Sequence, residues 1–155
     1  MNLKIDLPNE KATKSLGLKI AQSLPSVISD MTVVLKGEMG AGKSTVVRSV
    51  LRGMGYRNIV PSPTYTLVEP YEVQSGKIYH IDLYRISNPD ELEFLGWSDL
   101  NDGLKFIEWP ERVPLLFEQA DLILSLEYIS SGRTLEFSSR TKKGDDIVQK
   151  VYISG

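Results

Sequence analysis

Polar and apolar residues follow two periods along this chain, and each period predicts a different element. Alternation predicts strands, because successive side chains of a strand point to opposite faces of a sheet. A spacing of three and four residues predicts amphipathic helices. Five stretches fit strands, namely residues 3–7, 66–73, 77–84, 121–128 and 133–138, and two show the helical spacing, namely residues 9–24 and 43–52.

Turn residues between the predicted strands indicate two antiparallel hairpins. Ser75-Gly76 separates one pair of strands, and residues 130–132, Ser-Ser-Gly, separate the other. Such short glycine-containing connections are typical of hairpins. The final stretch, residues 141–155, predicts a polar turn with a short helix or strand.

Two further apolar runs predict short buried strands. They cover residues 32–35 and 104–107. Between them, residues 88–96 carry the signature of a compact helix, with asparagine as the cap, proline at the first position and glycine after the end. An acidic turn follows at residues 98–102. Helices, parallel strands and hairpins together predict an α/β fold with a mixed, mostly parallel central sheet and antiparallel edge hairpins.

Residues 37–45 read Gly-Glu-Met-Gly-Ala-Gly-Lys-Ser-Thr and match the phosphate-binding pattern G-x-x-x-x-G-K-[ST]. A strand precedes the motif and a helix starts inside it, so free helical N–H groups face the loop. Lys43 is expected to reach the β- and γ-phosphates, and the Ser44 hydroxyl is expected to hold Mg²⁺. A glycine-rich turn without a ligand is the alternative, which the flanking strand and helix disfavour.

Polar side chains at two strand ends are candidates for the chemistry. His80, Asp82 and Tyr84 share one face of their strand. Alone, this pattern fits a solvated sheet face, but after a P-loop it favours a functional Asp82, with His80 as a hydrogen-bonded structural residue. Glu108 follows the strand at 104–107, at the end where ligands of open α/β sheets bind, and could bind Mg²⁺ or orient water. Trp109 fits a core aromatic as well as a site wall.

Composition narrows the function classes. The chain has 155 residues, 41% hydrophobic and 25% charged, as expected for one globular domain over residues 1–155. It has no cysteine, which excludes disulfides and a thiol nucleophile. No run reaches the ~20 apolar residues of a membrane span, and no signal peptide is evident, so a cytoplasmic protein is expected. A net charge of -2 gives no basic field for non-specific binding of nucleic acid, so any link to RNA is expected to run through another protein or a small local patch.

Four stretches together resemble the bacterial TsaE family, also called YjeE. The stretches are the P-loop at residues 37–45, Ser-Pro-Thr-Tyr-Thr-Leu at 62–67, His-Ile-Asp-Leu-Tyr-Arg at 80–85 and Ile-Glu-Trp-Pro-Glu at 107–111. The P-loop is shared by many NTPases, whereas the other three in this order are far more selective. Two mild departures are Glu38-Met39 in place of the common Asp-Leu, and Ser44 in place of the usual threonine.

The resemblance implies an ATPase that acts with the partners TsaD and TsaB in threonylcarbamoyladenosine (t6A37) modification of tRNAs that decode ANN codons. It implies ATP and Mg²⁺ as cofactors, with Mg²⁺ held by Ser44 and Glu108, and Lys43, Asp82 and Glu108 as catalytic residues. It also implies nucleotide contacts and a switch-like group that couples to partners. The nucleotide contacts are Thr13, Glu38, Met39, Gly40, Ala41, Gly42, Lys43, Ser44, Thr45 and Arg133, and the switch-like group is Ser62, Pro63, Thr64, Tyr65, Thr66, His80, Asp82, Tyr84, Arg85 and Trp109.

Two other function classes remain open. The motif also resembles that of shikimate kinase and related small-molecule kinases, but the Asp-x-Asp and Gly-Gly patterns of those enzymes do not occur here. A nucleotide-gated binding module with negligible chemistry is the third class. Apart from the resemblance, Thr13 on the predicted helix at 9–24 is expected to be a solvated surface residue.

Overall fold

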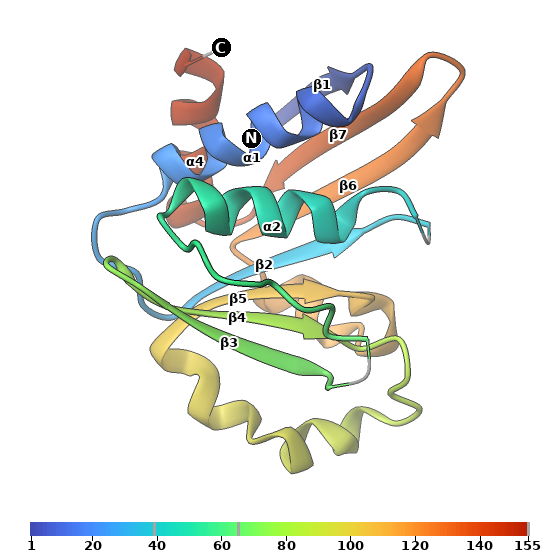
Figure 1. Ribbon diagram of the computed structural model, residues 1–155. Helices are drawn as coiled ribbons and strands as arrows, with labels where there is room; N and C mark the ends of the chain where they lie inside the picture. Colours follow the sequence, from blue (N-terminus) through green and yellow to red (C-terminus); the bar gives the residue numbers. More distant parts are fainter. Residues whose placement is uncertain (39, 65, 155) are drawn as a thin grey trace.

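The computed structural model describes residues 1–38, 40–64 and 66–154, so the predictions for Met39 and Tyr65 lie outside the described residues. Seven strands form one sheet in the order β1-β7-β6-β2-β5-β4-β3 (Figure 1). They are β1 (Asn2–Leu7), β2 (Met31–Lys36), β3 (Val68–Val73), β4 (Gly76–Asp82), β5 (Gly103–Glu108), β6 (Leu122–Ile129) and β7 (Gly132–Ser139).

The sheet is parallel in its centre and antiparallel at both edges. β2 pairs in parallel with β5 on one side and with β6 on the other, and β4 pairs in parallel with β5. β3 pairs antiparallel with β4, and β7 pairs antiparallel with both β6 and β1. The predicted fold class and both predicted hairpins are therefore confirmed.

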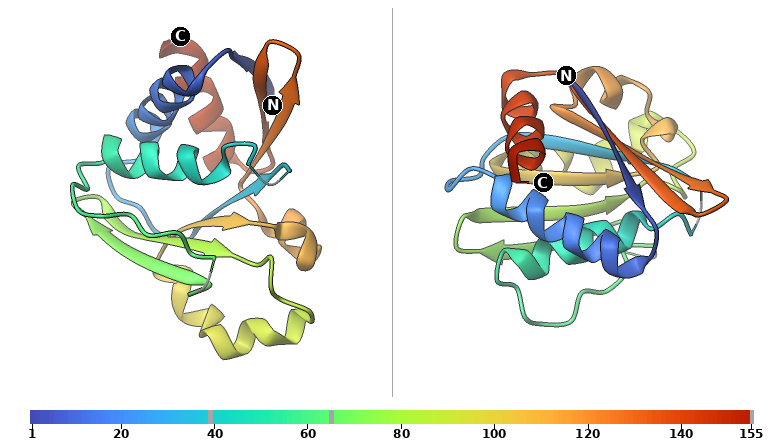
Figure 2. Two further views of the ribbon diagram at one scale, coloured as in Figure 1. Left: turned by 45° about the vertical axis from the view of Figure 1, so that its right-hand side comes forward. Right: turned by 90° about the horizontal axis from the view of Figure 1, so that it is seen from above.

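Three α-helices cover one face of the sheet, and short helices cover the other (Figures 1 and 2). The first group is α1 (Glu10–Ser23), α2 (Lys43–Gly53) and α4 (Lys142–Ser154). The second is α3 (Leu115–Gln119) with the 3₁₀ helices η1 (Pro89–Leu95), η2 (Trp97–Asp102) and η3 (Pro110–Arg112). Within the described residues, no helix is both long and apolar enough to cross a membrane.

Alternation along the central strands builds a hydrophobic core on each face. On β2, Val33 and Leu35 face the core under α1, α2 and α4, whereas Val34 faces the opposite core. On β4, Ile78 belongs to the first core and Ile81 to the second. Side chains of even number on β4 therefore point toward α2.

Close packing of α1 against α2 corrects the prediction that Thr13 is solvated. A Cβ on Gly17 would lie 2.3 Å from the Ser49 Cβ, so a larger residue there would hold the two helices apart. In this tight contact Thr13 is fully buried, and its hydroxyl donates to the Asn9 carbonyl at 3.4 Å. Thr13 lies three residues before Leu16 and seven before Ile20, so the helical period puts it on the same buried face, and its polar side chain does not keep it out of that contact.

Several element boundaries and types also differ from the sequence prediction. The last segment is the regular helix α4, whose buried stripe of Ile147, Val148 and Val151 lies behind a polar first turn. The compact helix at 88–96 is 3₁₀, with Asn88 as its N-cap in a capping box. α3 was not predicted, because five residues are too few to show a period.

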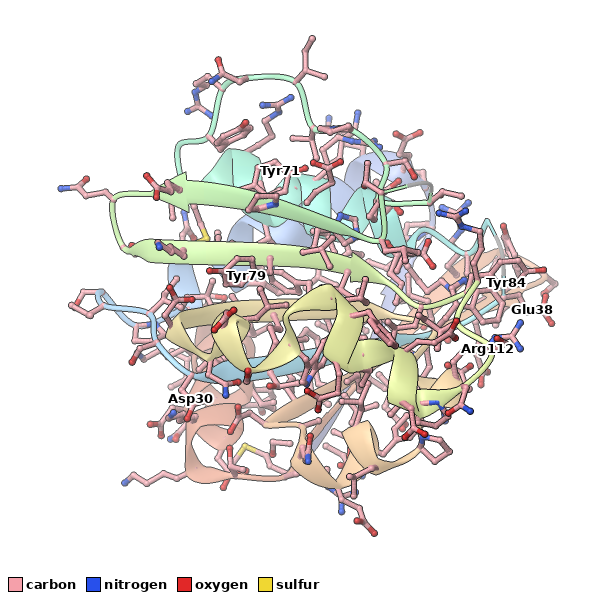
Figure 3. The ribbon with its side chains drawn as sticks, turned by 90° about the horizontal axis from the view of Figure 1, so that it is seen from below. Asp30, Glu38, Tyr71, Tyr79, Tyr84 and Arg112 are labelled. Atoms are coloured by element: carbon pink, nitrogen blue, oxygen red, sulfur yellow. The ribbon has the colours of Figure 1, made fainter. Side chains whose placement is uncertain are left out.

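The carboxyl ends of the parallel strands gather at one edge of the sheet. In Figure 3, Glu38, Tyr84 and Arg112 lie at this edge, and Asp30, which precedes β2, lies at the opposite end. The P-loop leaves β2 at the same edge (Figure 1). The fold thus brings the ends of β2, β4 and β5 together, where an open α/β sheet binds its ligands.

Candidate nucleotide and metal site

The P-loop connects the end of β2 directly to the start of α2. Gly42 is the N-cap of α2 and has a φ of 107°, a left-handed conformation that side-chain-bearing residues avoid. α2 then begins at Lys43, inside the motif, as predicted. A helix that starts here directs its unpaired N–H groups into the loop, which suits a polyphosphate.

Lys43 is buried, with 4% of its surface exposed, beneath the turn that follows β5. Its Nζ donates to the Gly37 carbonyl at 2.7 Å and lies 3.9 Å from the centre of the Trp109 ring. Burial lowers the pKa of Lys43, and the nearby carboxylates of Glu108, Glu111 and Asp82 oppose that shift. A bound phosphate would supply a counter-charge to this ammonium, which is shielded from solvent.

Glu108 accepts hydrogen bonds from two other elements. Its Oε2 accepts from the Ser44 hydroxyl at 2.8 Å and from Nε2 of His80. Burial raises the pKa of Glu108, but the hydrogen bonds from His80 and Ser44 and the charge of Lys43 outweigh it, so the pKa lies below its ordinary value. The corner therefore holds an ionised carboxylate next to a hydroxyl.

The residues of this corner fit Mg²⁺. The Ser44 hydroxyl and the Glu108 carboxylate are adjacent hard oxygen ligands, and Mg²⁺ bound with nucleotides usually takes only one or two protein ligands besides phosphate and water. Among the described residues, no group of three or more His, Cys, Asp or Glu is arranged to hold a metal. A metal at this corner would therefore depend on phosphate oxygens as well.

Asp82 ends β4 beside Glu108, its register partner on β5. It is 7% exposed, and its Oδ1 accepts the backbone N–H of Tyr84 at 2.8 Å. Burial raises the pKa of Asp82, and this hydrogen bond opposes the shift. Both Asp82 and His80 are buried, so the alternative of a solvated sheet face is wrong.

The side chains of Lys43, Ser44, Asp82 and Glu108 line one cavity of about 360 Å³. P-loop residues, acids and aromatic residues all contribute to its wall. The lining residues are Glu10, Gly40, Gly42, Lys43, Ser44, Thr45, Thr64, Asp82, Tyr84, Glu108, Trp109 and Arg133. Tyr84 packs on Trp109, with ring centres 4.9 Å apart, so Trp109 is a wall of the cavity as well as a packed aromatic.

The β6–β7 hairpin contacts the P-loop and contributes Arg133 to the cavity wall. The Tyr128 hydroxyl and Nη2 of Arg133 both donate to the Gly40 carbonyl, the latter at 3.4 Å. Glu10, which lines the cavity, was missed by the sequence reasoning. The available signal was an acid in the first turn of a helix, which the helix dipole alone also explains.

The remaining predicted residues lie behind the cavity wall or beside it. Thr13 is fully buried and does not line the cavity, whereas Glu10 on the same helix does. Arg85 reaches the site indirectly, because its Nε donates to the Thr64 carbonyl at 2.9 Å. The other predicted residues outside the lining are Glu38, Ala41, Ser62, Pro63, Thr66 and His80.

Comparison with known proteins identifies the family. Residues 7–135 match the model of the family described as threonylcarbamoyl adenosine biosynthesis protein TsaE. The chain belongs to the TsaE family. A TsaE protein of Haemophilus influenzae, named for tRNA threonylcarbamoyladenosine biosynthesis, is 37% identical over 146 residues and 92% of each chain. One from Synechocystis is 37% identical over 124 residues and 76% of each chain.

The TsaE match covers the site but not the whole chain. The cavity lining extends from Glu10 to Arg133 and falls inside the matched region, whereas α4 falls outside it. The solved structure of YdiB from Bacillus subtilis superposes with a TM-score of 0.77 at 22% identity, and covers 99% of this chain and 96% of its own. At that identity the likeness shows the fold alone.

Proposed function

We propose that this TsaE-family chain is an ATP-binding, slowly ATP-hydrolysing switch. The observation that carries the proposal is the convergence of the P-loop residues Lys43 and Ser44 with Glu108 and Asp82 on one cavity. Positive charge, helix N–H groups and a metal-binding corner are the parts that recur in phosphoryl-transfer sites.

Six side chains that line the cavity are assigned roles in this proposal. Lys43 leaves the Gly37 carbonyl and pairs with the β- and γ-phosphates. Ser44 and Glu108 would hold Mg²⁺, which would supply positive charge that offsets the charge of the phosphates. Asp82 faces the γ-phosphate end and orients the attacking water or senses the phosphate. Glu10 and Arg133, which also line the cavity, are assigned to the nucleoside.

The switch function is assigned to residues 62–66 and 82–85. Thr64 lines the cavity, and Nε of Arg85 donates to the Thr64 carbonyl, so a hydrogen bond links the two segments. Ser62 and Thr64 hydroxyls are hydrogen-bonded to each other at 2.7 Å in an exposed loop. A γ-phosphate that contacts Thr64 or Asp82 would order both segments, and hydrolysis would release them.

The output of the switch goes to partner proteins. The TsaE relatives carry names that refer to tRNA threonylcarbamoyladenosine biosynthesis. We therefore assign this chain to t6A37 modification of tRNAs that decode ANN codons, together with TsaD and TsaB. Threonylcarbamoyl transfer belongs to a partner, and tRNA is reached through the complex.

Phosphate release tests this proposal. The chain is assayed alone, with purified TsaD and TsaB, and with shikimate as a small acceptor. We expect turnover well below the ~1–100 s⁻¹ typical of kinases when the chain is alone. Partners should raise the rate, and shikimate should not. Fast phosphoryl transfer to shikimate without partners would instead make the chain a small-molecule kinase.

A further inference from the structure

His80 makes its polar contact directly with the proposed metal ligand. It lies on β4 and is 2% exposed, and its Nε2 faces Oε2 of Glu108. Within the described chain its other ring nitrogen, Nδ1, is buried and has no hydrogen-bond partner. His80 therefore does not bridge Glu108 to another polar group, and its polar function is directed at the carboxylate alone.

The two carboxylate oxygens of Glu108 differ in their hydrogen bonds. Oε2 accepts from both His80 and Ser44, which lie on β4 and α2. None of the described residues donates to Oε1, and Glu108 lines the cavity. Two donors on one oxygen fix the carboxylate plane, and they leave the second oxygen for a ligand.

We propose that His80 is the positioning residue of the metal corner: it holds Oε2 of Glu108 so that Oε1 is presented to a divalent cation bound with the nucleotide. This inference rests on the proposed ATP function and deepens it. A carboxylate ligand that is itself hydrogen-bonded keeps its orientation, and loss of such a partner typically costs 10–100-fold in metal affinity or activity. Ser44 alone cannot replace His80, because a metal would take the same hydroxyl as a ligand.

The proposal predicts a specific change in the linkage between metal and nucleotide. Calorimetry would measure the affinity for a non-hydrolysable ATP analogue with Mg²⁺ and with EDTA. The parent chain should bind the analogue more tightly with Mg²⁺, and His80→Leu should lower that ratio about tenfold or more. Affinity in EDTA should stay within about twofold, because the P-loop contacts are unchanged. His80→Gln, which keeps an N–H donor of similar reach, should restore most of the ratio.

Tyr71→Phe is the matched control. Tyr71 lies on the neighbouring strand, is 4% exposed, and has a buried hydroxyl without a partner in the described chain, so it has a burial similar to that of His80 but no contact with Glu108. An unchanged metal ratio in His80→Leu, or an equal loss of affinity with and without Mg²⁺, would overturn the positioning role. If His80→Leu does not fold, the comparison of His80→Gln with His80→Asn decides, since the shorter amide cannot reach Oε2. Absence of analogue binding to the parent would instead refute the ATP function itself.

Discussion

The chain buries two lysines against tryptophans, and only one of them faces a site. Lys43 is 4% exposed and lies 3.9 Å from the Trp109 ring centre, and Lys105 is 3% exposed and lies 5.4 Å from that of Trp97. Burial lowers the pKa of both lysines. A buried cation with a perturbed pKa is therefore not enough to mark a functional site.

The surroundings of the two lysines make the difference. Lys105 donates to the side-chain oxygen of Asn101 at 2.5 Å, on the helix that covers it. Nearby, Asp102 accepts from the Tyr79 hydroxyl at 2.6 Å. Among the described residues, Lys43 has only a backbone carbonyl as its acceptor, and it borders a cavity with two buried carboxylates. Lys105 is satisfied by a side chain of the fold, whereas Lys43 borders the cavity and is available to a ligand.

The largest expected effect, on ATP affinity, follows from replacing Lys43, the lysine that borders the cavity. Lys43→Met should weaken ATP binding about 100-fold, because loss of a charge-assisted contact costs up to about 3 kcal/mol. Lys105→Met, in which a similar burial is kept, should leave the ATP Kd within about twofold. Calorimetry measures both. Equal Kd values for the parent and Lys43→Met would refute the P-loop assignment.

Exchange of one carboxylate at each end of β5 sharpens the same comparison. Glu108→Gln should keep the fold and lower Mg²⁺-dependent hydrolysis at least tenfold, because the amide keeps the shape but loses the charge that a metal ligand supplies. Asp102→Asn, outside the site, should hydrolyse ATP at the parental rate. Phosphate release is the measurement. A parental rate in Glu108→Gln would mean that Glu108 neither binds metal nor orients water.

The residues of the cavity around Lys43 and Glu108 were more predictable from sequence than the packing that surrounds them. The motif at 37–45 and the strand that delivers Glu108 are local patterns, and the structure brings them together as expected. Alternation also showed that His80 and Asp82 share a face, but it could not show that α2 covers that face. Burial of a face depends on elements distant in sequence, which no local period encodes.

Errors in the prediction have the same origin. Glu10 and Thr13 lie less than one turn apart on α1, so only the packing against α2 decides which of them faces the cavity. The short helix α3 and the 3₁₀ form of η1 depend on packing against the second core. The order of strands and helices read from the pattern did predict the class of fold, since such a succession leaves few topologies.

A smaller effect is expected from the residue proposed to couple the phosphate to the partner surface. Asp82→Asn should lower the stimulation of ATP hydrolysis by TsaD and TsaB several-fold and change ATP affinity less. The asparagine can still accept the Tyr84 N–H, so the turn keeps its shape while the charge is lost. Phosphate release with and without partners measures the stimulation. Equal losses of binding and stimulation would place Asp82 in the nucleotide site alone.

The smallest expected effect is spectroscopic, and it compares the two lysine–tryptophan pairs directly. The chain has two tryptophans, so Trp97→Phe leaves Trp109 as the only indole, and Trp109→Phe leaves Trp97. When Lys43 moves from the Trp109 ring to a phosphate, the charge near that indole changes, whereas the Lys105 pair stays as it is. ATP titration should therefore change the emission of Trp97→Phe and leave that of Trp109→Phe constant. Emission changes in both variants would show that nucleotide binding also changes the surroundings of Trp97. Constant emission from Trp109 would mean that Lys43 keeps its position when the cavity is filled.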